Sequence, residues 1–181
     1  MPVLNDYTEQ DTRFRCDAEW FISSVSESIY VTTIGGTAER LLDLYFELIA
    51  HVDRHVDLAI VSVRNDVAWR GETLAVTDVV EAFERARPDL VANGGVEVTA
   101  FTEHDQVSLT PPLGIVIYAR TARWTELLRS RGMAERQVPP PSVWKLHPHA
   151  WAEVAALTES LGAVVTRLRL RSLTRPEDEL P

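Results

Sequence analysis

The sequence predicts a single α+β (or α/β) domain in which helices pack on a mixed β-sheet. Three observations predict this class: an amphipathic helical stretch at residues 38–51, an apolar run directly after it, and alternating apolar residues further along. At 181 residues the chain is long enough for one domain with a proper core. We expect that domain over residues 13–172, between a flexible segment at residues 1–12 and a disordered acidic tail at residues 173–181.

The first half of the chain contains the clearest structural unit. Residues 13–16 fit a short strand, and residues 17–25 fit a short helix or, almost equally well, a strand. A strand at residues 28–34, two glycines, the helix and a strand at residues 58–63 together predict a βαβ unit. Apolar and polar residues do not alternate in the strand at residues 58–63. We therefore expect this strand, which contains Ile60, to lie at the middle of the sheet with helices covering both faces.

The middle of the chain predicts antiparallel strands. Residues 65–76 are expected to form a loop, and Asp78 begins a helix that Pro88 ends. Alternating residues predict a half-buried strand at 96–101. One or two further strands follow over residues 107–118, and their short connections favour antiparallel pairing.

The last third of the chain is expected to contain two helices and one strand. Thr121 begins the first helix and Gly132 ends it. Pro148 begins the second, which Gly162 closes, and a final strand covers residues 163–171. The predicted order is therefore approximately β-α-β-α-β-β-α-α-β.

Composition narrows the function classes. The formal net charge of −9 argues against non-specific nucleic-acid binding, which needs clustered cations. No apolar run reaches membrane-spanning length, and the N-terminus lacks a signal-peptide pattern. Cys16 is the only cysteine, which favours a reducing, cytoplasmic setting. Lys145 is the only lysine among 18 basic residues, as codon bias in a GC-rich bacterial genome would produce.

The turn Gly35-Gly36-Thr37 is a candidate ligand-binding site. Glycines let a phosphate approach the backbone, and the N-terminus of the following helix offers free N–H donors for a small anion. Neither a Walker A pattern nor GxGxxG is present, however. A tight strand-to-helix turn capped by Thr37 explains the same residues.

Histidines are the other candidates for chemistry. His51 and His55 are four residues apart, and His147 and His149 could approach them in the fold. The helix is expected to end near His51, so the two imidazoles are not expected on one helix face. The spacing also matches no closed set of metal ligands, and we therefore predict no metal and no cofactor. The sequence contains no GxSxG nucleophile elbow, no HExxH zinc motif, no paired CxxC and no EF-hand loop. It therefore identifies no catalytic residue.

Two segments are candidates for partner binding. Arg167, Arg169 and Arg171 alternate on the predicted last strand and could hold an acidic group, although charges also protect strand edges. Trp144 and Lys145 follow three consecutive prolines, and an exposed tryptophan in a stiff loop is a natural binding anchor.

These observations predict a non-catalytic cytoplasmic binding protein, an acidic regulator, adaptor or inhibitor-type protein that acts through a protein partner. The alternative is a small enzyme or ligand sensor that binds an anionic small molecule at Gly35–Thr37, with histidines as acid–base groups. The two differ in whether the histidines converge near that turn.

Overall fold

The computed structural model describes residues 19–138 and 154–173 of the chain. Within these residues the element order is β1 (Trp20–Ser26), β2 (Ile29–Gly35), α2 (Ala38–Ile49), β3 (His55–Ser62), β4 (Val67–Ala75), α3 (Val76–Phe83), α4 (Arg87–Asn93), β5 (Val96–Phe101), β6 (Asp105–Leu109), β7 (Ile115–Ala119), α5 (Arg123–Ser130), β8 (Ala134–Glu135), α6 (Ala155–Leu168) and β9 (Arg171–Ser172). The predicted strand at residues 13–16 lies outside the described residues.

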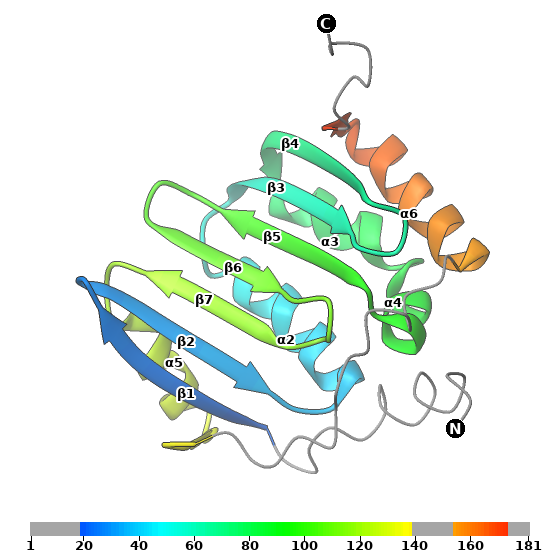
Figure 1. Ribbon diagram of the computed structural model, residues 1–181. Coiled ribbons are helices and arrows are strands. Elements are labelled where there is room, and N and C mark those ends of the chain that lie inside the picture. The colour runs from blue at the N-terminus through cyan, green and yellow to red at the C-terminus, as the bar shows by residue number, and fades with distance from the viewer. Residues whose placement is uncertain (1–18, 139–153, 174–181) are drawn as a thin grey trace, which may run out of the picture.

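The described strands form one mixed sheet in the order β8-β1-β2-β7-β6-β5-β3-β4-β9 (Figure 1). Only β1 and β8 pair in parallel, and every other neighbouring pair is antiparallel. The predicted α+β class, a mixed sheet with helices packed on it, is confirmed. β2 and β3 run in the same direction, as a βαβ unit requires, but β7, β6 and β5 lie between them.

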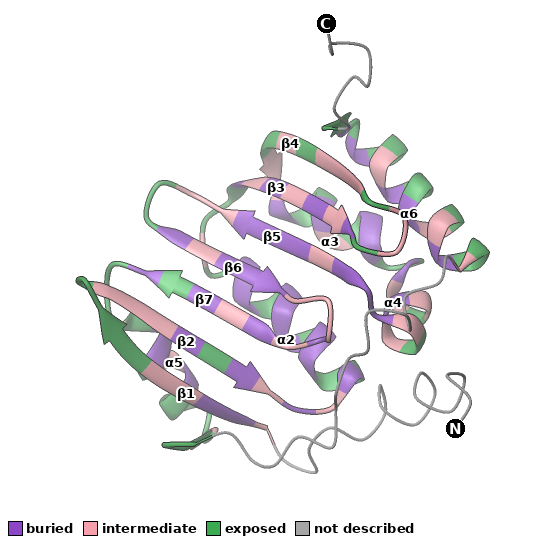
Figure 2. Ribbon diagram, viewed as in Figure 1, coloured by how far each residue is buried: buried purple, intermediate pink, exposed green. Residues whose placement is uncertain are grey.

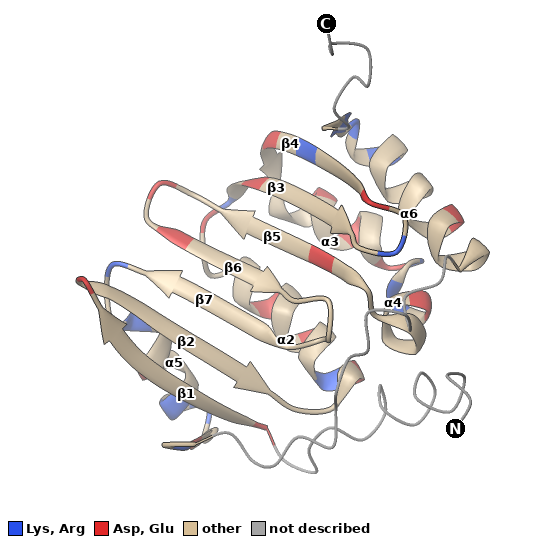
Figure 3. Ribbon diagram, viewed as in Figure 1, with Lys and Arg blue, Asp and Glu red and all other residues tan. Residues whose placement is uncertain are grey.

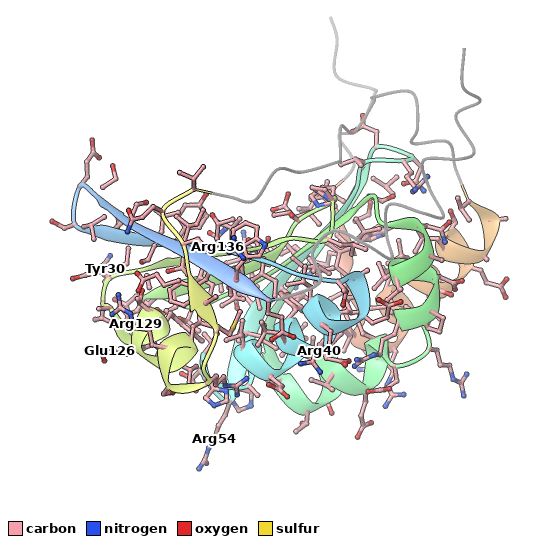
Figure 4. The ribbon with its side chains drawn as sticks, turned by 90° about the horizontal axis from the view of Figure 1, so that it is seen from below. Tyr30, Arg40, Arg54, Glu126, Arg129 and Arg136 are labelled. Atoms are coloured by element: carbon pink, nitrogen blue, oxygen red, sulfur yellow. The ribbon has the colours of Figure 1, made fainter. Side chains whose placement is uncertain are left out.

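The described helices all lie on one face of the sheet. Figure 1 shows α2, α3 and α5 behind the strands with α4 and α6 to the right of them, and Figure 4 shows the sheet edge-on with α2, α3 and α5 below it. Aliphatic side chains from the covered face fill the space between the two layers, including Ile34, Leu58, Ile60, Val98 and Ile117 (Figure 2). From the helices, α2 contributes Leu41, Tyr45 and Leu48 to this core. Burial of this apolar surface is the main source of stability for the fold.

The prediction that β3 is sandwiched by helices is wrong. Burial alternates along β3, with Val56, Leu58 and Ile60 buried and Ala59 and Val61 only half-buried. One face of this strand therefore packs on helices, and the other, which carries Asp57, Ala59 and Val61, has no described helix over it. β3 is also not at the centre of the sheet, since only β4 and β9 follow it on that side.

Three further elements differ from the sequence prediction. Residues 20–26 form strand β1, so the strand alternative was right for them. Residues 67–75, predicted as a loop, form β4 and pair with β3. The helix that Pro88 was expected to end already stops at Phe83, and Pro88 lies instead in the first turn of a separate helix, α4, where proline is well tolerated.

The predicted final strand at residues 163–171 is wrong for most of its length. α6 continues through Gly162 to Leu168, with Leu157, Leu161, Val164 and Leu168 buried at helical spacing. A Cβ on Gly162 would meet no atom within 4 Å, so this glycine neither ends the helix nor serves a close contact. No helix in the described part of the chain has the length and apolar character needed to cross a bilayer.

Candidate binding face

The face of the sheet opposite the described helices is the candidate binding surface, and we call it the helix-free face. Residues paired directly across neighbouring strands point to the same side of a sheet. The first row on this face consists of Ile22, Thr33, Val116, Ser108, Thr99, Ala59, Arg70 and Arg171. The second row consists of Ser24, Val31, Tyr118, Gln106, Phe101 and Asp57.

A chain of hydrogen bonds occupies the centre of this face. The Thr99 hydroxyl donates to Glu97 Oε1 at 3.0 Å and lies 2.9 Å from the Ser108 hydroxyl. Since Thr99 has one hydroxyl hydrogen, Ser108 must donate to Thr99, and Gln106 Nε2 donates to Ser108 at 3.1 Å. The donors therefore all point along the chain toward the Glu97 carboxylate.

The hydrogen bonds between Gln106, Ser108, Thr99 and Glu97 satisfy the polar groups of the two hydroxyl residues. Ser108 is 4% and Thr99 8% exposed, although no described helix covers them. Buried hydroxyls without partners would carry a desolvation penalty, whereas these already have theirs. A partner that covers this part of the face therefore does not have to supply hydrogen bonds to either hydroxyl.

A second cluster lies where β3, β4 and β5 meet. The Arg70 guanidinium is 3.6 Å from Asp57, 3.9 Å from Glu72 and 5.3 Å from the centroid of the Phe101 ring. Asp57 Oδ1 also accepts the backbone N–H of Thr73 at 2.9 Å. That bond lies beside an irregularity in the β3–β4 pairing, where Thr73 has a positive φ of 54°. Asp57 thus fixes both the bulged strand and the arginine.

Tyr118 is the most exposed large hydrophobic side chain of the two rows. It is 43% exposed and pairs with Val31 on one side and Gln106 on the other. Phe101, which pairs with Gln106 from the next strand, is half-buried. β1, β2 and β7 contain no charged residue, so the charges of this face lie toward β5, β3 and β4 (Figure 3).

Tyr45 lies directly beneath the sheet, on α2. Its hydroxyl is buried and has no hydrogen-bond partner in the described structure. Burial raises the pKa of Tyr45 well above its usual range; the Ala100 backbone amide opposes this rise, and the negative charge of Glu97 adds to it. The phenol therefore stays un-ionised in the folded protein.

The structure places the predicted ligand-binding turn at the start of α2. A Cβ on Gly35 would lie 2.2 Å from the Trp20 ring, so the glycine is needed to seat that indole. Thr37 is the N-cap residue, but its side chain makes no capping hydrogen bond. Nearby, Arg40 Nε donates to Glu19 at 2.6 Å. The indole therefore fills the space on the side of Gly35 where a side chain would project.

The described histidines do not converge on that turn. His51 follows α2 at its other end, roughly 18 Å away for a twelve-residue helix. Its Nδ1 donates to the Glu47 carbonyl at 2.8 Å and so caps the helix. His55 opens β3 and is exposed. His147 and His149 lie outside the described residues, within which no group of three His, Cys, Asp or Glu side chains is placed to hold a metal ion.

The predicted arginine stripe does not exist as one surface. Arg167 lies on α6 and forms an ion pair with Glu81 of α3. Arg169 is the left-handed C-cap of that helix, with a φ of 52°. Only Arg171 is on a strand, opposite Arg70 at the margin of the helix-free face. Trp144 and Lys145 lie outside the described residues.

Sequence reasoning missed the cluster of Arg70, Asp57 and Phe101 because it assigned β4 to a loop. A signal was available: Val67, Trp69 and Thr73 are strand-forming types, and Asn65-Asp66 before them is a turn pair. Asp66 has a positive φ of 52°, as such a turn uses.

Comparison with known proteins gives no relative: no family model, no curated protein and no solved structure matches this chain.

Proposed function

We propose that this chain is a non-catalytic cytoplasmic binding protein, an acidic regulator, adaptor or inhibitor-type protein of bacterial origin that acts through a protein partner. The observation that supports this proposal is the helix-free face, where the exposed ring of Tyr118 and the half-buried ring of Phe101 flank Gln106. Aromatic side chains surrounded by polar neighbours are enriched at protein–protein interfaces.

The two hydroxyls at the centre of this face favour binding over catalysis. A nucleophilic hydroxyl needs a base beside it and an accessible position for the reacting atom. Thr99 and Ser108 are almost fully buried, and each is already committed to a neighbour in the hydrogen-bonded chain. The described histidines lie away from the glycine turn that the enzyme alternative requires.

Tyr118 is the proposed anchor. A tyrosine presents a large, rigid ring with few rotatable bonds, so immobilising it costs little entropy. The neighbouring hydroxyl chain and the Arg70 cluster are held in place by their own contacts, which lowers the cost of ordering the surface on binding. Trp144 and Lys145, predicted from the sequence, are proposed as additional contacts of the same partner.

The test begins with the tagged full-length chain, used to isolate a partner that is then purified and titrated by calorimetry. Tyr118→Ala is expected to weaken binding more than about tenfold, as for an interface hot spot. Tyr30→Ala is the matched control, because Tyr30 pairs with Ala119 in the adjacent strand but faces the helix side. Its affinity is expected to change less than about threefold.

Two outcomes of this experiment would contradict the proposal. If no protein is retained beyond an untagged control, the binding function is wrong. If the Tyr118 and Tyr30 variants bind equally well while both stay folded by circular dichroism, the partner does not use this face. Trp144→Ala, in the same titration, tests the contact predicted from the sequence.

A further inference from the structure

The two margins of the sheet are protected to different degrees. At the β1 margin, β8 pairs with Trp20 and Phe21, and the backbone N–H of Arg136 donates to the Phe21 carbonyl at 2.8 Å. Beyond that point, residues 22–26 have no outer neighbour in the described structure. Among the described residues, more than half of β1 is therefore an open strand edge.

The direction of the free backbone groups follows from the β8 contact. The Phe21 carbonyl points outward to Arg136, and successive residues of a strand direct their backbone groups to alternate sides. The N–H and C=O groups of Ser23 and Val25 therefore also point outward, while those of Ile22 and Ser24 bond inward to β2. An outer strand can pair with Ser23 and Val25 without breaking the existing sheet.

This edge lacks the usual protection against pairing. Natural edge strands carry charges, prolines or bulges that prevent another strand from adding. Residues 22–26 are Ile-Ser-Ser-Val-Ser, with no charge and no proline, and Val25 is 60% exposed.

The opposite margin has these devices. β9 pairs with Trp69 and Arg70, and the backbone N–H of Leu173 donates to the Ala68 carbonyl at 2.8 Å. The rest of β4 carries Glu72 and the positive-φ residue Thr73 beside the pairing irregularity. The contrast indicates that the β1 edge is open for association.

We propose that residues 22–26 of β1 pair antiparallel with the same residues of a second copy of this chain, which joins two sheets into one. An antiparallel pair of identical strands has two-fold symmetry, so each copy supplies the donors and acceptors that the other needs. No charged side chain within residues 22–26 opposes its symmetry mate. The pairing also covers Val25 of both copies.

Charges at the two ends of the edge favour this arrangement. Glu27 lies in the turn after β1. Arg136, which is labelled in Figure 4, follows β8 at the other end of the open stretch. Neither side chain forms an ion pair with a described residue. Antiparallel pairing carries Glu27 of one copy toward Arg136 of the second copy, twice per dimer. Opposite charges therefore meet at both ends of the joint strand pair.

The first experiment measures the molar mass of the purified full-length chain by light scattering and sedimentation at several concentrations. The parent chain is expected at twice its 20.3 kDa mass. Val25→Lys places a charge on the strand edge. Val25→Pro removes the outward-pointing N–H of residue 25, which makes no hydrogen bond to β2, so the existing sheet is kept. Both variants are expected at half the parent mass, with unchanged circular dichroism.

Val63→Lys is the matched control, because Val63 is also an exposed valine, at 44%, but follows β3 at the other end of the sheet. It is expected to remain dimeric. A monomeric parent chain, or Val25 variants that stay dimeric, would overturn the proposal. The result does not depend on whether a protein partner exists, so it stands apart from the function proposed above.

The second experiment tests the orientation. Glu27→Arg and Arg136→Glu are each expected to weaken the dimer, because each places like charges together at both ends. The double variant restores opposite charges and is expected to recover the parent dissociation constant. Equal dimerisation by all four proteins would contradict the antiparallel arrangement.

Discussion

The two faces of the sheet use neighbouring residues of the same strands for different purposes. On the covered face, one row of paired residues consists of Phe21, Ile34, Ile115, Leu109, Val98, Ile60 and Trp69. The adjacent row on the helix-free face replaces these with threonine, serine, alanine and arginine at most positions. Stability therefore depends mainly on one face, and the other is free to carry recognition.

The largest expected difference is between Ile117 and Val116, which are adjacent in β7 but face opposite sides. Ile117 is buried in the core, so Ile117→Ala removes packing and leaves a cavity, and we expect a loss of about 3 kcal/mol. Val116→Ala is expected to cost less than about 1 kcal/mol. Urea unfolding followed by circular dichroism measures both; equal losses would mean that the helix-free face is also a packed core.

A smaller effect is expected at the orphaned hydroxyl beneath the sheet. Tyr45→Phe removes a buried group without a partner and is expected to raise the free energy of unfolding by about 1 kcal/mol at neutral pH.

The same variant has a signed pH dependence. Because the pKa of Tyr45 is raised on folding, the unfolded chain loses this proton first, and the parent chain loses stability above about pH 10. Tyr45→Phe lacks this contribution, so its advantage should grow with pH. Tyr118→Phe, on the helix-free face, is the control; a Tyr45 variant less stable than the parent would show that the hydroxyl has a favourable role.

The smallest effect is expected on the outer surface of the helices. Arg167 and Glu81 join α6 to α3, and both side chains are more than half exposed. Arg167→Gln should therefore change the free energy of unfolding by less than about 1 kcal/mol, with the difference shrinking further in high salt. A larger loss in thermal unfolding would mean that ion pairs contribute to holding the helix layer together.

The sequence predicted the elements whose burial is periodic. α2 appears where helical spacing placed it and β5 where alternation placed it, and β2 and β7 overlap the strands predicted at residues 28–34 and 107–118. The wrong secondary-structure predictions came from ambiguous local signals. Gly162 suggested a helix end, but Leu161 and Val164 continue the buried stripe, and packing outweighs the roughly 1 kcal/mol cost of a helical glycine.

The candidate surface was harder to predict, because its rows join residues from up to eight strands. Thr99 and Ser108 have no local pattern that brings them together; only the β5–β6 register does. Likewise, Arg70 reaches Asp57 and Phe101 only after β4 pairs with β3 and β3 with β5. Sequence spacing contains no direct information on such pairing.

The position of β2 affects how the chain assembles during synthesis. Its first neighbour, β1, is made just before it and can form a hairpin at once, but its second neighbour, β7, is made only after β6. The side of β2 that faces β7 stays unpaired until β7 has been synthesised, because Tyr30 pairs there with Ala119. Such distant pairing slows folding, so we expect the nascent chain to expose an uncharged strand to the ribosome exit and its chaperones until late in translation.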